Sequence, residues 1–475
     1  MARQRCIRLC VTAVIVGLLV ASVPTSPATA RKVRRYGRIG SGVVHKVIRQ
    51  RKPRRVIHVV VADVAGRAAL KVALSNGSLP GLEKTSSMAR RHGAIAAING
   101  DFFRPSGRPV AAFAKSGHLV QKPLTWGANL AFSRGGRKTH MGHPKVTVQL
   151  VGAASGATTT IARVNQGRPR RAQLRLYTKQ GGRLARPPRN SCSARVRRTG
   201  PNRFDSETER VMAPVKVVYV ACRKKRMGLG RGMVVAARRW GQGKKVIRAL
   251  RSNRRQKLGW SLGWPNVAET IGGNPVLIKD GELAWSNLHG SHPLFRSHPR
   301  TGVGIRADGK ILLVTVDGRR PRYSRGMTML GFARFMKSLG AEWALNLDGG
   351  GSTTMVVKGR VMNRPSDGRE RPVGSALLIV GKRSRYRSSL SLPDPSGDDG
   401  PATSERLELG TESGDDEALA FDLAERDPAS IGGLASWLSV EGQEMPRGLA
   451  GVARDFDRDR FQKLTRGLGL PPATP

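Results

Sequence analysis

The sequence predicts an α+β fold, with mixed, mainly antiparallel sheets and a few covering helices in a single domain. Between residues 107 and 150, short apolar runs alternate with Gly, Pro and charged residues, which is typical of antiparallel strands. The stretch 301–318, TGVGIRADGKILLVTVDG, places Asp308-Gly309 between two apolar runs, a strong hairpin signal. Apolar residues at 332, 335, 336 and 339 have the spacing of a helix that lies on a core.

The first half of the chain predicts strands with one helix. The runs VIHVVVAD and RAALKVAL, at 56–63 and 67–74, predict a hairpin. Residues 82–93 predict a helix that leads into an apolar strand with the polar tip NGDFF. Further strands are expected at 212–222 and 232–237. Residues 163–210 are rich in Arg and irregular, so we expect a long loop or insertion there.

The last third has the clearest pattern. Residues 269–282 contain a strand with an Asp-Gly turn. The helix over 324–340 starts at Ser324 or Thr328 as a cap and ends at Gly340. A strand at 341–348, a hairpin at 354–362 and a final strand at 373–380 follow it.

Composition divides the chain into four segments. Residues 1–30 combine Arg residues, a short apolar run and an A-x-A site, which predicts a secretory signal peptide. Residues 31–55 predict a basic linker, and 56–382 the main domain, with an Arg-rich insertion at about 152–260. Residues 383–475 are acidic and rich in Pro, Gly and Ser, which predicts a disordered tail. No stable membrane span is expected after cleavage of the signal.

The charge is extreme and unevenly distributed. The whole chain has a formal net charge of +52, whereas residues 391–475 hold 17 acidic and 8 basic residues. Such a field attracts polyanions, among them nucleic acid, acidic membrane and phosphate-rich wall polymer. Because export separates the protein from chromosomal DNA, we expect no nucleic-acid partner, and an anionic cell-surface polymer fits better. An Arg-rich solvated surface without a partner is an equally simple interpretation.

The cysteines agree with export. Two of the four lie in the signal segment, which leaves Cys192 and Cys222 in the mature chain. One such pair in an exported protein is most simply a disulfide.

Three acidic residues end apolar strands and are candidate catalytic groups: Asp101 in NGDFF, Asp317 in VTVDGRR and Asp348 in NLDGGGS. Each could simply begin a turn, as Asp beside Gly often does. However, Asn99 and Asn346 precede two of these residues by two positions, which places each Asn and Asp on one face of a strand. The sequence therefore predicts a convergent polar site beside glycines that admit another molecule closely.

Cationic residues stand in the loops before two strands. His298-Pro-Arg300-Thr301 precedes the hairpin strand, and Arg371 precedes the final strand. An arginine can bind phosphate oxygens with two parallel hydrogen bonds, although either residue could equally be surface. Gly351-Ser352-Thr353 lacks the G-x-S-x-G elbow of a serine hydrolase, and the chain has neither a P-loop motif nor H-E-x-x-H.

Several segments in order resemble the phosphodiester glycosidase family: INGDFF, GGNPVLIKDGE, HPRTGVGIRADGKILLVTVDGRR, the stretch through LDGGGSTTMVVKGRV, and NRPSDGRERPVGSALLI. The resemblance spans roughly residues 56–382 and is strongest over 269–380. It implies an exported enzyme that hydrolyses sugar-1-phosphodiester bonds in wall or exopolysaccharide glycans.

The resemblance suggests roles for the candidates. Asp348 would act at the anomeric carbon, with Asp101 as base or sugar-hydroxyl acceptor and Asp317 in reserve. The phosphate would be held by Arg300 and Arg371. The substrate-binding candidates are Asn99, Thr301, Asn346, Gly349, Gly350 and Ser352.

Two alternatives remain open at this stage. A non-catalytic basic protein could hold anionic wall polymer through its surface charge. A divalent cation could also bind at the Asp and Asn cluster, because oxygen ligands suit Ca²⁺ or Mg²⁺. No cofactor is required by the sequence.

Overall fold

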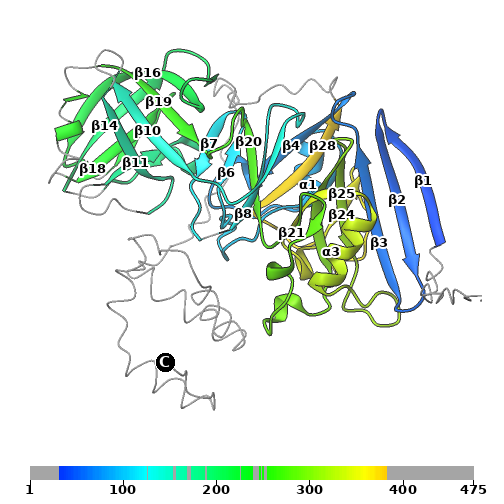
Figure 1. Cartoon of the computed structure of the whole chain (residues 1–475). Helices are drawn as coiled ribbons and strands as arrows, with labels where there is room; N and C mark the ends of the chain where they lie inside the picture. Colours follow the sequence, from blue (N-terminus) through cyan, green and yellow to red (C-terminus); the bar gives the residue numbers. More distant parts are fainter. Residues whose placement is uncertain are drawn as a thin grey trace, which may run out of the picture.

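The computed structural model describes residues 32–381 except 126, 153–156, 168–172, 188–189, 225, 239–244, 248 and 251–253. The predicted signal peptide and acidic tail lie outside these residues. Strands account for 49% of the structure and helices for 11%, so the fold is mainly β, and the prediction of an α+β fold with covering helices is wrong. The reason is that the sheets bury most of their apolar faces against one another or by closing into a barrel. Two lobes result (Figure 1), a main body and the barrel.

The main body is built on an eight-stranded sheet with the order β1-β2-β3-β24-β23-β25-β21-β22, which we call the large sheet. All of its pairings are antiparallel. Its strands are β1 (Lys32–Gly40), β2 (Val43–Gln50), β3 (Arg55–Ala62), β21 (Val276–Lys279), β22 (Glu282–Leu283), β23 (Arg300–Arg306), β24 (Ile311–Val316) and β25 (Ala341–Asn346). The predicted hairpin around Asp308-Gly309 is therefore confirmed as β23–β24.

Two five-stranded sheets complete the main body. The first has the order β27-β26-β5-β28-β4, and the second β7-β6-β20-β8-β9. Their strands are β4 (Ala68–Leu74), β5 (Ala94–Asn99), β26 (Met355–Val357), β27 (Arg360–Val361) and β28 (Ser375–Gly381), then β6 (Phe113–Lys115), β7 (His118–Gln121), β8 (Ala128–Phe132), β9 (Thr139–Gly142) and β20 (Glu269–Gly273).

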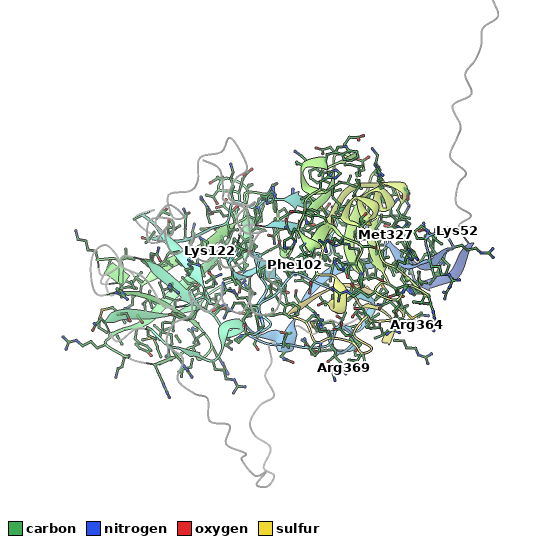
Figure 2. All side chains as sticks on the ribbon, turned by 90° about the horizontal axis from the view of Figure 1, so that it is seen from below. Lys52, Phe102, Lys122, Met327, Arg364 and Arg369 are labelled. Carbon is green, nitrogen blue, oxygen red and sulfur yellow. A yellow bond between two sulfur atoms is a disulfide. The ribbon has the colours of Figure 1, made fainter. Side chains whose placement is uncertain are left out.

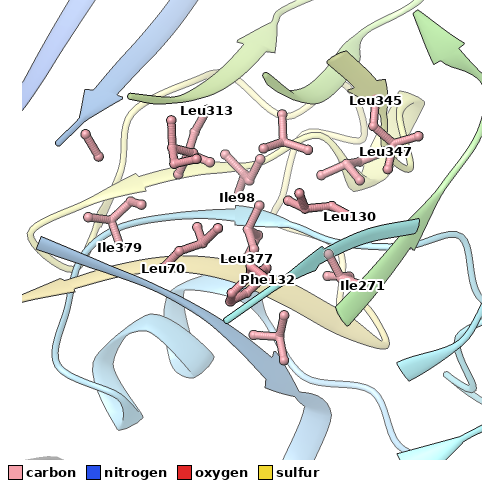
Figure 3. Packing of buried hydrophobic residues seen from close by; sticks show 14 of the residues in the cluster. Leu70, Ile98, Leu130, Phe132, Ile271, Leu313, Leu345, Leu347, Leu377 and Ile379 are labelled. Atoms are coloured by element: carbon pink, nitrogen blue, oxygen red, sulfur yellow. The ribbon is translucent and has the colours of Figure 1, made fainter. Parts of the chain in front are cut away.

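The central core lies between the large sheet and these two smaller sheets. Figure 3 shows Leu313 and Leu345 of the large sheet facing Ile98, Leu377 and Phe132 of the smaller ones. Along β24, residues 311 and 313 face this core, whereas 312 and 314 face the opposite side. Both faces of that strand are thus covered, which explains its uninterrupted apolar run.

Two α-helices cover the outer faces. The predicted helix 324–340 is confirmed as α3 (Met329–Ser338), whose Phe332 and Met336 pack on the far side of the large sheet. Thr328 caps its start by accepting a hydrogen bond from Gly331 N. The helix α1 (Thr85–Arg91) packs Met88 against the outer face of β5 and β28. Short 3-10 turns occupy Ser75–Gly77, Lys179–Gly181, Trp285–Asn287, Pro293–Phe295 and Gly350–Ser352.

The second lobe is a seven-stranded barrel closed by the pairing of β14 with β16. Around the ring the strands are β14 (Ser191–Arg198), β18 (Met233–Arg238), β12 (Leu174–Tyr177), β11 (Thr158–Val164), β10 (Thr147–Gly152), β19 (Arg255–Ser261) and β16 (Arg210–Cys222), with β15 (Arg203–Asp205) attached to β16. Only the β11–β12 pairing is parallel among the described strands. A separate short pair joins β13 (Leu184–Ala185) to β17 (Met227–Gly228).

Strands also occupy two stretches where the sequence indicated none. Residues 31–55 contain β1 and β2, which extend the large sheet. Residues 163–210 contain β12 and β14, which form part of the barrel wall. The expected disulfide between Cys192 and Cys222 is present and joins directly opposed positions of β14 and β16. Among the described residues, no helix is long and apolar enough to span a membrane.

Candidate active site

The ends of β5 and β25 meet in the main body. Asp348 N donates to Gly100 O over 3.0 Å, and the side chain of Asn99 donates to Asp348 O over 2.6 Å. The two polar tips that the sequence singled out, NGD and NLD, therefore lie against each other. Behind them, Ile98 and Leu347 are fully buried in the central core (Figure 3), which fixes both turns on a rigid base.

Asn99 connects three segments at this point. Its side-chain amide oxygen Oδ1 accepts hydrogen bonds from Thr301 Oγ1 at 2.9 Å and from Thr354 N at 3.1 Å. Thr301 also bonds to the Thr353 hydroxyl. Because Asn99 and Thr301 are fully buried, their role is to hold the 348–354 turn in place, and neither side chain is presented to a substrate.

Asp101 is a buried carboxylic acid with one oxygen left free of hydrogen bonds. Its Oδ2 accepts from Ala111 N at 2.8 Å, whereas Oδ1 has no partner within the described chain. The carboxyl lies against Gly272, where a Cβ would come within 2.7 Å of Oδ2. Burial raises the pKa of Asp101 to about 7, and the negative charge of Asp348 adds to the rise. An orphaned buried oxygen of this kind can take part in proton transfer.

Asp348 is half-buried, so it is the more accessible member of the pair. Burial raises its pKa to about 6, against the lowering effects of the Ser352 hydroxyl, the Arg371 guanidinium and the Gly349 backbone amide. Burial favours the protonated form of both groups, and the charge of Asp348 favours it further at Asp101, so Asp101 is the more readily protonated of the two. Two carboxyl groups with separated pKa values can divide the work of base and acid.

The glycine run after Asp348 leaves room for two arginines. A Cβ on Gly350 would lie 3.1 Å from an Arg319 nitrogen, and a Cβ on Gly351 would lie 2.2 Å from an Arg371 nitrogen. The Arg371 guanidinium also pairs with Asp367 at 2.6 Å. Gly350 has a φ of +57°, which favours glycine on its own account. The turn thus presents bare backbone beneath two guanidinium groups.

Arg300 does not join these arginines. Its side chain is 2% exposed, and it donates hydrogen bonds to the carbonyl oxygens of Met327 and Leu294 at 2.9 and 2.7 Å. Burial lowers the pKa of its guanidinium to about 10. Its hydrogen bonds hold the 293–298 loop to the start of α3, so we assign it a structural role in place of the phosphate contact that the sequence suggested.

Asp317 is a buried anchor one layer behind the turn. It accepts hydrogen bonds from Asn363 Nδ2, Arg364 N and the Tyr323 hydroxyl, at 3.1 to 3.2 Å. The same Asn363 amide donates to Thr353 O at 2.9 Å. Burial raises the pKa of Asp317 to about 6, and these donors oppose the rise. Asp317 supports the Gly-rich turn through Asn363. Both of its carboxyl oxygens already accept hydrogen bonds from within the protein.

Asn346 serves the neighbouring loop. Its amide nitrogen donates to Asn274 O at 2.7 Å, and its side-chain oxygen has no partner within the described chain. The adjacent Gly273 packs on Asn346 O, where a Cβ would approach to 2.4 Å.

A divalent cation fits this cluster poorly. The amide oxygen of Asn99 is already bonded to a hydroxyl and a backbone amide. Across the described residues, no group of three or more His, Cys, Asp or Glu side chains could hold a metal ion.

Some residues of the site were not predicted from the sequence. Arg319 follows Asp317 by two positions and Asp367 precedes Arg371 by four, yet in so basic a chain neither stood out. Ser375, whose hydroxyl accepts from Asp101 N, and Gly272 lie far from both motifs in sequence. The Ser-Asp-Gly-x-Glu-Arg spacing of 366–371 is the local signal that could have identified Asp367.

A well-formed cavity exists elsewhere. It has a volume of about 200 Å³ and lies inside the barrel, lined by Leu119, Val148 and Trp260 among others. We nevertheless place the candidate active site at Asp101 and Asp348, because two carboxyl groups with raised pKa values lie there, whereas the described lining of the cavity contains no Asp or Glu.

Fold and site together define a β-rich protein with a paired-carboxylate site at a glycine turn flanked by arginines. Residues 221–380 match the family model described as phosphodiester glycosidase, so the family resemblance seen in the sequence is confirmed over this part of the chain. Asp317, Asp348 and Arg371 lie within the matched segment, whereas Asp101 precedes it.

Two curated relatives match over short stretches. The chain is 39% identical over 103 residues to an uncharacterized SPβ prophage-derived protein, YomE, of Bacillus subtilis, which covers 22% of this chain and 16% of that protein. It is 38% identical over 68 residues to the mouse N-acetylglucosamine-1-phosphodiester α-N-acetylglucosaminidase, covering 14% and 13% of the two chains. The matches thus span less than a fifth of either relative.

Solved structures share the fold over a larger part of the chain. A hypothetical protein from Synechocystis superposes with a TM-score of 0.55 at 20% identity, covering 74% of this chain and 64% of its own. A putative exported protein from Burkholderia pseudomallei gives a TM-score of 0.50 at 23% identity, covering 69% and 74%.

Proposed function

We propose that the protein is an exported phosphodiester glycosidase that hydrolyses sugar-1-phosphodiester bonds in wall or exopolysaccharide glycans. The observation that carries this proposal is the contact between the Asp101 and Asp348 turns, with raised and unequal pKa values, beneath Arg319 and Arg371. The match of residues 221–380 to the phosphodiester glycosidase family supports the same reaction class.

The bond to be broken joins the anomeric carbon to a phosphate oxygen. Its cleavage by water gives a free sugar and a phosphomonoester. A phosphomonoester is a stable leaving group, so one ionised carboxylate and one proton donor of modest strength suffice. Asp348 would act at the anomeric carbon as nucleophile or as base for water, two roles that the stereochemical outcome distinguishes.

Asp101 would complement Asp348 from the buried side. With a pKa of about 7, it carries a proton in part of the population at neutral pH. Its unpartnered Oδ1 could donate a hydrogen bond to the substrate or accept one from a sugar hydroxyl. Burial within the same site keeps this exchange away from bulk water.

Arg371 and Arg319 would bind the phosphate. Both guanidinium groups lie over the glycine turn, and a guanidinium matches phosphate oxygens with paired hydrogen bonds. Asp367 would hold Arg371 in place before the substrate arrives, through their ion pair. The absence of side chains at Gly349 to Gly351 lets Pro299 O, Arg319 and Arg371 pack close to the turn.

Export is part of the proposal. The predicted signal peptide and the Cys192–Cys222 disulfide both suit an oxidising, extracellular setting.

The direct test uses a small sugar-1-phosphodiester such as UDP-N-acetylglucosamine and measures the release of free sugar. We expect Asp348→Asn to lower kcat/KM by about 10³-fold or more, in the range of losses for groups that act on reacting atoms. Asp308→Asn is the matched control, because Asp308 lies in an exposed hairpin turn of the same domain. Unchanged turnover in a folded Asp348→Asn protein would refute the assigned role.

A non-catalytic anionic-polymer-binding protein is the second candidate, favoured by the charge. It predicts steeply salt-dependent polymer binding and no sugar release by the wild type.

A further inference from the structure

The barrel surface carries a groove lined by cations that the proposed active site does not use. The groove has a volume of about 450 Å³ and is lined by Arg195, Arg197, Lys216, Arg231 and Arg254 together with apolar residues. We call it the cationic groove. Figure 2 shows many nitrogen-tipped side chains projecting from this lobe.

Three cations form a row across neighbouring strands. Arg197 of β14 lies directly opposite Lys216 of β16, and Lys216 lies directly opposite Arg255 of β19. Residues that are directly opposed in antiparallel strands project from the same face. All three side chains are exposed, so the row stands on the outside of the barrel. Adjacent strands are about 4.8 Å apart, which gives the row a length of roughly 10 Å.

The row is electrostatically unfavourable in the free protein. Like charges placed directly opposite each other on a sheet destabilise it. Residues 147–261, which span the barrel, contain 29 Lys and Arg against three Asp and Glu. Within the described part of the chain, none of the groove cations or Arg255 forms an ion pair with an acidic side chain.

The few acidic residues of the barrel are placed away from the row. Asp205 is bonded to Glu207 N and the Thr208 hydroxyl within its own turn. The hydrogen bond from the Thr208 hydroxyl lowers the pKa of Asp205, and the charge of Lys257 lowers it further. Among the described ion pairs none joins these acids to the row, and the repulsion within the row is left for an external anion to relieve.

The chemistry of the groove suits a chain of phosphodiesters. The row offers two guanidinium groups, each able to make two-pronged contacts to phosphate oxygens, with an ammonium group between them, which a single small anion would not use. Tyr219 is exposed beside the groove, but Arg195 lies over its ring at 4.6 Å from the centroid. That guanidinium takes up one face of the ring, and no aromatic residue is among the described residues that line the groove itself, whereas single-stranded nucleic acid stacks its bases on aromatic side chains.

We propose that the cationic groove binds an extended phosphodiester-linked glycan and holds it on the protein while the site at Asp101 and Asp348 cleaves it. The second half of this statement rests on the proposed function, whereas the binding does not. The barrel would then make the enzyme selective for polymers over small phosphodiesters.

Binding is tested with poly(N-acetylglucosamine 1-phosphate) and full-length protein that carries Asp348→Asn, so that the polymer is not consumed. In this background we compare Arg197→Gln/Lys216→Gln/Arg255→Gln with the control Arg51→Gln/Lys52→Gln/Arg67→Gln, which removes three exposed charges from the main body. We expect the groove variant to bind about tenfold or more weakly at low salt, with a salt slope smaller by about 2, and the control to change little. Equal losses in both variants would reduce the effect to net charge and overturn the proposal.

An oligothymidylate of equal charge provides the nucleic-acid arm. Weaker binding of this strand than of the glycan supports the assignment, and equal or tighter binding, reduced by the groove variant, would overturn the glycan as partner. Neutral dextran should not bind.

Catalysis provides the second arm, in protein with Asp348 intact. The groove variant should raise KM for the polymer about tenfold while leaving kcat/KM for UDP-N-acetylglucosamine unchanged, since the small substrate does not reach the groove. An unchanged KM for the polymer would overturn the coupling. Failure of the wild type to release sugar from either substrate would refute the proposed function, and the binding comparison would still decide the groove.

Discussion

Asp101 and Asp348 lie in the same site but differ in burial and in the groups that surround their carboxyls. Asp101 is 1% exposed and surrounded by backbone amides, Ala111 N foremost, whereas Asp348 is half-buried and faces a hydroxyl and a cation. Their pKa values therefore separate, to about 7 and about 6. The sequence could place each Asn-x-Asp pair at a strand end, but the burial that distinguishes the two acids arises from distant residues such as Gly272.

The pH dependence of the reaction follows from this separation. Below about pH 6, Asp348 gains a proton and loses its action at the anomeric carbon, so kcat/KM should fall. Above about pH 7, Asp101 loses its proton, and kcat/KM should fall again if Asp101 donates one. We expect a bell-shaped profile for the wild type, measured on UDP-N-acetylglucosamine. In Asp101→Asn the alkaline limb should disappear; its persistence would assign that limb to another group.

The pH dependence of stability that Asp101 causes should have the opposite sign to that of an acid in a salt bridge. Its pKa rises from 3.8 to about 7 on folding, so between these values the folded protein binds more protons than the unfolded chain. The free energy of unfolding therefore falls as pH rises from about 4 to 7. Asp101→Asn removes this loss, and its Tm should exceed that of the wild type by more at pH 8 than at pH 4. A constant Tm difference would show that the carboxyl is not strained by burial.

At the scale of elements, turns and strand ends were predicted well and their mutual contacts were not. The β23–β24 hairpin and α3 follow directly from Asp308-Gly309 and from the apolar stripe of the helix. Arg300 is the first residue of β23 in the same hairpin, and its side chain turns inward to backbone carbonyls. The direction in which the Arg300 side chain points depends on which loop packs over the strand. No local sequence pattern predicts that packing.

The strand β20 supports the site through a glycine. A Cβ on Gly272 would lie 2.1 Å from the Ala111 Cβ and 2.7 Å from Asp101 Oδ2. We expect Gly272→Ala to lower the free energy of unfolding by about 1 to 3 kcal/mol and to reduce kcat, because the Asp101 carboxyl must move. Gly228→Ala is the control, since nothing lies within 4 Å of its Cβ. Chemical denaturation and steady-state kinetics measure both effects, and equal behaviour of the two variants would contradict the proposed packing.

At the scale of the whole molecule, the barrel was the feature that could not be predicted from the sequence. Along β16 the residues from 213 to 217 alternate between buried and exposed, and Arg and Lys occupy much of the exposed face of the barrel. In composition, such strands look like an irregular basic loop. Closure of the barrel depends on the long-range pairing of β14 with β16, which no short window contains.

The barrel core also takes in residues of β6, β7 and β8, but it is distinct from the core behind the active site, which leads to a prediction about the disulfide. Cys192 and Cys222 lie in the barrel core or against it, whereas Ile98 and Leu347 belong to the core behind the active site. The bridge closes a separation of 30 residues, so its loss should destabilise the barrel by roughly 3 to 4 kcal/mol on the chain-entropy estimate. We therefore expect Cys192→Ala/Cys222→Ala to lower the Tm and weaken hydrogen-exchange protection mainly in residues 147–261. Turnover of a small phosphodiester below that Tm should stay within about twofold of the wild type, because no barrel side chain contacts Asp101 or Asp348 among the described hydrogen bonds and ion pairs. A parallel loss of turnover and of protection in the main body would show that the two cores unfold as one unit.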